Sequence, residues 1–221
     1  MEREYGHFME ENQRETAKEL GMAAGSGGIH CVTIIGQVEG HQLLDSEIKT
    51  TKYEHIMPLL AAIEETKEIH GVLLLLNTVG GDVDAGLGIA ELIAGMSKPT
   101  ASLILGGGHS IGVPLAVAAK RSFIAPSAAV TLHPVRLNGV VLGAPQSYGY
   151  LEQMQERVAG FIAGHSHIPK ERLMEYMLAT DTLATDLGTV ITGTEAVACG
   201  LIDALGSLRD ALDWLHGQTE I

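Results

Sequence analysis

The chain has 221 residues, of which 46% are hydrophobic, and a formal net charge of −13 at pH 7. This size and composition favour one domain with a substantial core. The negative charge argues against binding to nucleic acid or to an anionic membrane surface, because both require a cationic patch. No segment approaches the roughly 20 apolar residues that span a bilayer, and no secretory signal is recognisable, so we expect a cytoplasmic protein without a membrane span.

The start of the chain is predicted to be a flexible tail. Residues 1–28 are charged and polar and end in a Gly-Ser-Gly-Gly sequence, which is typical of a hinge. One compact domain is therefore expected over residues 29–221. Cys31 and Cys199 are too few for a disulfide framework and lack the spacing of metal ligands, so we predict reduced thiols, no metal and no cofactor.

Short apolar runs alternate with stretches of helical periodicity through the first two thirds of the domain. Strands are expected at 30–36, 71–77, 100–105, 121–124 and 129–133, and helices at 54–69, 82–96 and 110–120. The remainder is predicted to contain helices at 145–163 and 169–178, a strand at 189–192, and closing helices at 194–203 and 208–216. Strands that alternate with helices indicate an α/β fold with mainly parallel pairing.

Ser110 is the first candidate for chemistry. It follows the buried strand 100–105 and three glycines, and it lies at the predicted first turn of a helix. Free N–H groups and a positive partial charge at that position would let the N–H of Ile111 stabilise an oxyanion formed at Ser110. The simpler interpretation, which the serine alone does not exclude, is a helix N-cap on a glycine-rich turn.

Two further segments are predicted to end at the same edge of the sheet. The strand 71–77 leads to a turn at Gly80 and Gly81, and the N–H of Gly81 would be a second oxyanion donor. His133 ends the strand 129–133, and a neutral imidazole there is suited to accept the proton of Ser110. His109, next to the serine, is interpreted as a wall of the pocket.

A group that orients the histidine is also needed, and the spacing alone does not identify it. The candidates are Asp181, Asp186 and Asp203. His165 and His167 could form a metal pair, but no carboxylate or thiol cluster accompanies them, so a surface turn between two helices is favoured.

Several segments together resemble the proteolytic subunit of the Clp protease, a serine peptidase, over roughly residues 29–206. The matching segments are Gly36-Gln-Val-Glu39, Asn77-Thr-Val-Gly-Gly81, His109-Ser110-Ile111, His133-Pro134 and Glu195 to Asp203. Within the family, segments 133–139, 145–148 and 187–190 are similar to a branch called translocation-enhancing proteins of spore-forming bacteria.

The resemblance implies a Clp-protease/crotonase-like superhelix of repeated ββα units with a protruding handle helix. It implies that Ser110 is the nucleophile and His133 the base, and that the N–H groups of Gly81 and Ile111 form the oxyanion hole. It further implies a homo-oligomeric ring, with the handle packing two rings together, and peptide or unfolded protein substrates bound as an added strand.

The sequence departs from the family pattern at the third triad member. Counted back from Glu195 without gaps, the family's aspartate falls on Gly188, and the nearest acid is Asp186, which a shift of two residues would bring into place. Asp186 is therefore the predicted orienting acid. The acidic tail does not resemble the family's axial gating loops, so an unfolding ATPase partner is doubtful.

Three functions are compatible with these residues. The first is a ring-forming serine endopeptidase that works through an acyl-enzyme. The second is a catalytically weak or inactive Clp-like scaffold or adaptor in secretion or sporulation, which the displaced aspartate favours. The third is a crotonase-type acyl-CoA enzyme, which shares the fold and the paired N–H groups but needs no Ser-His pair.

Overall fold

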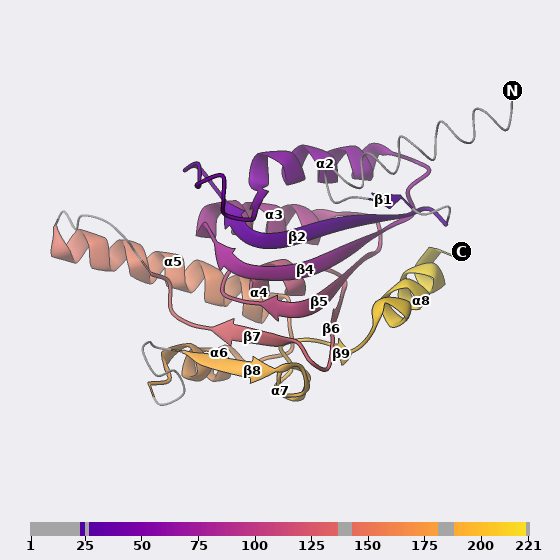
Figure 1. The fold of residues 1–221 in the computed structure, drawn as a ribbon. Coiled ribbons are helices and arrows are strands. Elements are labelled where there is room, and N and C mark those ends of the chain that lie inside the picture. Colours follow the sequence, from indigo (N-terminus) through magenta and orange to yellow (C-terminus); the bar gives the residue numbers. More distant parts are fainter. Residues whose placement is uncertain (1–22, 25–26, 137–142, 181–187, 220–221) are drawn as a thin grey trace, which may run out of the picture.

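A computed structural model describes residues 23–24, 27–136, 143–180 and 188–219 of the protein. One mixed sheet, mostly parallel, runs in the order β1-β2-β4-β5-β6-β9, and β3, β7 and β8 join it off this path (Figure 1). The strands are β1 Ala23–Ala24, β2 Ile29–Glu39, β3 Thr50–Lys52, β4 Gly71–Gly81, β5 Thr100–Gly108, β6 Arg121–Ile124, β7 Ala129–Leu132, β8 Thr189–Thr192 and β9 Ala204–Leu205. The predicted α/β class is confirmed.

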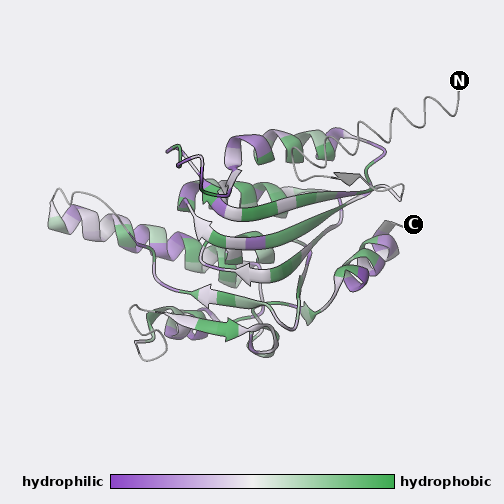
Figure 2. Cartoon of the chain, viewed as in Figure 1, coloured by the Kyte–Doolittle hydropathy of each residue, from purple (hydrophilic) through white to green (hydrophobic). Residues whose placement is uncertain are grey.

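Helices cover both faces of the sheet (Figure 1). They are α2 Tyr53–Glu65, α3 Val83–Gly95, α4 Gly112–Val117, α5 Ala144–Gly164, α6 Lys170–Leu178, α7 Gly193–Ala198 and α8 Leu208–Thr219. The main core lies between the sheet and α2, α3 and α4, and a smaller core lies between α8 and the other face of β4 and β5. Figure 2 shows hydrophobic residues concentrated along the central strands, as expected for strands buried on both faces.

The glycine-rich segments predicted as turns belong to the strands, and this part of the prediction is wrong. β4 continues through Gly80 and Gly81, which pair with Gln37 and Val38 of β2 after a shift in register. β5 likewise includes the three glycines 106–108. Gly80 has φ +95°, a conformation that glycine adopts readily, so the chain can continue past the irregularity without turning away.

Two predicted helices are shorter than expected, and each has a local cause. The helix predicted at 110–120 is α4, which begins only at Gly112, because Ser110 has φ +56° and cannot be helical. The helix predicted at 194–203 is α7, which ends at Ala198 because Gly200 adopts φ +80°, and the chain then forms β9 against β6.

The N-terminal boundary includes one strand that periodicity did not predict. Ala23–Ala24 pair antiparallel with His30 and Cys31 as β1. Residues 1–22, most of the predicted tail, lie outside the described residues.

The predicted handle is α5, which projects away from the sheet (Figure 1). It begins with a proline in its first turn, a position that proline favours because its missing N–H is not needed there. Buried residues occupy only its second half, from Met154 to Ile162. Across the described residues, no helix has both the length and the hydropathy to cross a membrane.

Candidate active site

The ends of β4, β5 and β7 meet at one cavity of about 200 Å³. Gly81, Ser110, Ile111 and His133 all line it, so four of the five predicted site residues are brought together. The rest of the wall is mainly apolar: Val83, Thr131, Leu132, Pro134, Val135, Arg136, Val158, Ile162 and Met177. Figure 1 shows why they converge, because β4, β5 and β7 run side by side in the same direction.

Ser110 adopts an unusual backbone conformation. Its φ of +56° makes it the one non-glycine residue with positive φ in the described part of the chain. Its N–H donates to Thr131 O at 3.0 Å, and its carbonyl oxygen accepts from the Val113 N–H at 3.0 Å. Backbone strain of this kind clusters at functional sites, and a strained serine between a strand and a helix is the arrangement that exposes the nucleophile in α/β-hydrolases.

Gly80 and Gly81 each let the backbone of β4 approach a neighbouring segment closely. A Cβ atom on Gly80 would lie 2.6 Å from the Ser110 Cβ, and one on Gly81 would lie 2.1 Å from the Val38 carbonyl oxygen. Both distances are too short for any side chain, so glycine is required at each position. Gly80 therefore brings the backbone of β4 directly against the serine, and Gly81 brings it against β2.

Two polar side chains that were not predicted as site residues hold this strand end in place. The buried Thr78 hydroxyl donates to Gly36 O at 2.6 Å and accepts from the Gly80 N–H at 3.0 Å. The Asn77 side-chain oxygen accepts from the Gly107 N–H at 3.1 Å, where the pairing of β4 and β5 is irregular. The available signal was two polar residues that interrupt an otherwise apolar strand.

Ile111 lines the cavity beside Ser110. Its side chain is buried in the main core, where a Cβ atom on Gly86 of α3 would lie 2.3 Å from the Ile111 Cγ1. This packing fixes the peptide between Ser110 and Ile111, which is the group that an oxyanion hole would use.

His133 follows β7 and is half-buried in the cavity wall. Its Nδ1 lies 2.7 Å from the carbonyl oxygen of Pro134. Because a carbonyl can only accept, Nδ1 must carry the proton and donate it, which leaves Nε2 free to accept one. No hydrogen bond joins His133 to Ser110 within the described residues, and such pairs often tighten only when substrate binds.

Gly188, the position reached by counting back from Glu195 without gaps, lies directly beside this histidine. Gly188 has φ +119°, and a Cβ atom on it would lie 2.3 Å from Leu132 O and 2.8 Å from the His133 Cβ. No aspartate fits there without movement of the backbone. Asp181 and Asp186, two of the predicted candidates, lie outside the described residues.

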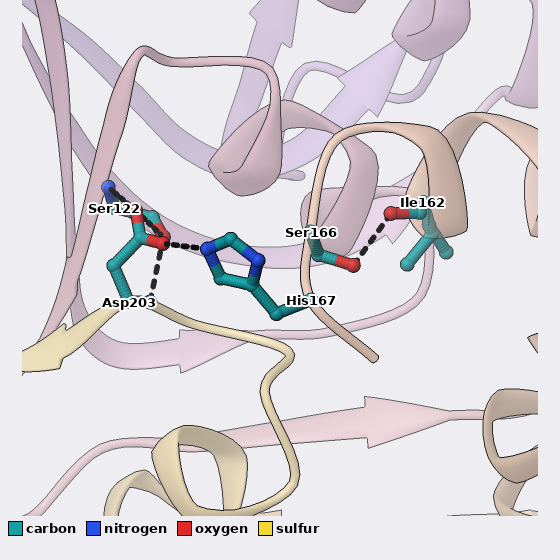
Figure 3. Close-up of polar contacts among 5 residues, drawn as sticks. All are labelled: Ser122, Ile162, Ser166, His167 and Asp203. Carbon is teal, nitrogen blue, oxygen red and sulfur yellow. Dashed lines mark hydrogen bonds and ion pairs between the residues drawn. The ribbon is translucent and has the colours of Figure 1, made fainter. Parts of the chain in front are cut away.

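Asp203, the third candidate acid, serves a different purpose (Figure 3). Its carboxylate accepts from the N–H of Ser122 at 2.8 Å and from the Ser122 hydroxyl at 3.0 Å, and it lies 3.6 Å from the His167 Nε2. The His167 side chain is 82% exposed, so this ion pair contributes little. Asp203 therefore ties β6 to the segment before β9 and does not orient His133.

The two histidines considered as a metal pair have separate partners. His165 Nδ1 lies 2.9 Å from Phe161 O, so it donates there, and its ring stacks on Phe161. His167 faces Asp203 (Figure 3). The described residues contain no group of three or more potential ligands that could hold a metal ion.

This constellation of a strained serine, a histidine and paired glycine-rich strand ends coincides with a match to a known family over residues 26–209, described as Clp protease. The chain belongs to the Clp protease family. The fold expected from that resemblance is thereby confirmed.

Relatives in this family include the translocation-enhancing protein TepA of Halalkalibacterium halodurans. It is 57% identical over 187 residues, which cover 85% of this chain and 73% of the relative. The ATP-dependent Clp protease proteolytic subunit 1 of Protochlamydia amoebophila is 27% identical over 172 residues, 74% of this chain and 82% of its own. The predicted similarity to the translocation-enhancing branch is confirmed.

Proposed function

We propose that the protein is a serine endopeptidase that hydrolyses peptides or unfolded protein segments inside a ring-shaped oligomer. Ser110 is the nucleophile, His133 the general base, and the N–H groups of Gly81 and Ile111 the oxyanion hole. The observation that carries the proposal is the strained Ser110 sharing one cavity with His133 and both donors. Membership of the Clp protease family supports the peptidase class over an acyl-CoA enzyme. A cytoplasmic location belongs to the same proposal.

The reaction follows from these positions. The Ser110 hydroxyl oxygen attacks the peptide carbonyl carbon while its proton passes to Nε2 of His133. The negative charge on the carbonyl oxygen is stabilised by the two N–H groups, and collapse of the intermediate breaks the C–N bond. His133 returns its proton to the leaving amine. Water, deprotonated by His133, then hydrolyses the ester to release the acid and regenerate Ser110.

A fluorophosphonate tests the nucleophile directly, because it forms a stable adduct only with an activated serine. We expect one adduct per chain, located by peptide mapping at Ser110. An adduct at another residue, or none after prolonged incubation, would contradict the proposed mechanism.

Asp186 stays a prediction, and its expected contribution is small because the Pro134 carbonyl already accepts from Nδ1 of His133. We expect Asp186→Asn to slow fluorophosphonate labelling by no more than about tenfold. Loss of a full triad carboxylate would instead cost about 10⁴-fold. Asp203→Asn is the matched control, since Asp203 bonds Ser122 away from the cavity, and it should label at the wild-type rate. If Asp186→Asn slowed labelling by about 10⁴-fold, Asp186 would be the third member of a conventional triad.

The homo-oligomeric ring, single or stacked, is supported by the family and by the projecting helix α5, whose outer half has no buried residues. An isolated exposed helix end with Tyr148 69% exposed and Tyr150 49% exposed is the kind of surface that a second subunit would cover. Light scattering at micromolar concentration should give a mass several times the 23.4 kDa of one chain. A monomeric mass would contradict the ring.

The alternative is a Clp-like scaffold or adaptor with weak or no hydrolysis, acting in secretion or sporulation. It is favoured by Gly188, which occupies the place of the family's aspartate against His133, and by the name of the relative TepA, translocation-enhancing protein. A Ser110→Ala gene that fully complements a deletion strain would support this alternative and count against the peptidase.

A further inference from the structure

The strand that carries His133 has little backbone pairing with the strand that leads to Ser110. β5 and β7 share one paired position, Gly107 with Ala129. On its other edge β7 pairs with β8 through all four of its residues. Because this pairing is so short, it does not by itself fix the distance between the ends of β5 and β7. Other contacts between the two segments must do so. The separation of Ser110 from His133 is therefore set mainly by what joins the serine turn to β7.

Two hydrogen bonds make that connection, and both end on Thr131, two residues before His133. The N–H of Ser110 donates to the Thr131 carbonyl oxygen at 3.0 Å. The Nδ1 of His109 lies 2.8 Å from the Thr131 hydroxyl oxygen. On the opposite side, the His109 N–H donates to Thr78 O of β4 at 3.0 Å. The serine turn is thus held between β4 and β7.

The imidazole of His109 is itself held in place. It packs over the backbone of Gly107, where a Cβ atom would lie 2.3 Å from the His109 Nε2, so only glycine leaves room for the ring. Burial, and then the nearby charge of His133, lower the pKa of His109. A neutral ring is thereby favoured, and with either tautomer its Nδ1 can donate to or accept from the threonine hydroxyl.

We propose that His109 and Thr131 are positioning residues, whose side-chain hydrogen bond fixes the Ser110 turn to the strand that presents His133. The inference rests on the proposed peptidase function and extends it to two side chains that act through Ser110 and His133. Thr131 lines the cavity, whereas His109, predicted as a wall of the pocket, is not among the residues that line it.

The first test measures the rate constant of fluorophosphonate labelling at Ser110. Thr131→Val keeps the shape of the side chain and removes the hydroxyl, and His109→Ala removes the ring. Because misplacement of a reacting group by about 1 Å can cost about 100-fold, we expect each variant to label 10- to 100-fold more slowly. The double variant should be no slower than the slower single variant, since both lose the same bond.

Conservative variants separate positioning from general damage to the fold. Thr131→Ser keeps a hydroxyl, and His109→Asn places an amide close to where Nδ1 lies, so both should recover most of the wild-type rate. Thr51→Val is the matched control, because it also removes a hydrogen-bonded threonine hydroxyl from a strand. The Thr51 hydroxyl bonds to the backbone of Ile35, on β3 and outside the cavity lining. This variant should label at the wild-type rate.

The second test needs no catalysis. The amide of Ser110 donates to Thr131 O, so hydrogen exchange in peptides that cover residues 109–113 should be faster in Thr131→Val and in His109→Ala than in the wild type. The inference would be overturned if both variants kept the wild-type rate of hydrogen exchange in these peptides and the wild-type rate of labelling. A wild-type protein that takes no label would refute the proposed function instead, and the exchange measurement would then decide the inference by itself.

Discussion

Ser110→Ala is expected to abolish fluorophosphonate labelling and to reduce peptide hydrolysis by about 10⁶-fold, to the background of a site without its nucleophile. The loss should be this large because no other serine or cysteine lines the cavity in the described part of the chain. The variant should still fold, since the Ser110 hydroxyl makes no hydrogen bond with another described residue and its backbone bonds to Thr131 and Val113 remain. Hydrolysis of a fluorogenic peptide and the melting temperature are the two measurements.

Ser207→Ala is the matched control for this prediction. The Ser207 hydroxyl caps α8 by accepting from the Asp210 N–H at 3.4 Å, and it donates to the Asp210 carboxylate at 2.6 Å, well away from the cavity. Its loss should cost about 1 kcal/mol of stability, as for other helix caps, and leave hydrolysis unchanged. Residual hydrolysis in Ser110→Ala above about 1% of wild type would assign the nucleophile to another residue.

His133→Ala is expected to slow both labelling and hydrolysis by at least about 10³-fold. The imidazole accepts the proton of Ser110, and the alanine side chain has no atom that can replace it in this role. Because the substitution leaves a space where the ring was, added imidazole is expected to restore part of the rate in the variant and to have no effect on the wild type.

His165→Ala is the control for the second prediction, because it also removes a histidine whose Nδ1 donates to a backbone carbonyl, at the end of α5. It should keep the wild-type rate. A His133→Ala variant that reacts within tenfold of wild type would mean that another group is the base. His109 would then be the next residue to replace, since its imidazole interacts electrostatically with that of His133.

The elements that were predicted well are those whose pattern arises within the element itself. The apolar runs of β4 and β5 were recognised because both of their faces are buried, and α5 because its apolar residues recur at helical spacing. The wrong predictions concern the glycine-rich segments, which were expected to be turns and belong to β4 and β5. Gly80 and Gly81 continue β4 because β2 lies beside them to pair with, and glycine content alone does not distinguish a turn from an irregular strand end.

Among the candidate site residues, too, those with a local sequence pattern were predicted, and those that depend on contacts between distant segments were not. Ser110 and His133 were predictable because each ends or follows an apolar strand, and parallel strands bring such ends to one edge. His109 and Thr131 are 22 residues apart, and Asn77 and Gly107 are 30 apart, so no local pattern relates them. Asp203 looked equivalent to the other acids until its bonds to Ser122, 81 residues away, removed it as a candidate.

The sequence by itself determined the α/β class, the family, and the serine and histidine of the candidate site, because periodicity and short motifs are properties of neighbouring residues. The tertiary structure alone decided that Ser110 is strained, that Gly188 packs against His133, and that Thr131 joins the Ser110 turn to the strand before His133. Those facts depend on the register between strands, and a shift of one residue in register would place different side chains at the cavity.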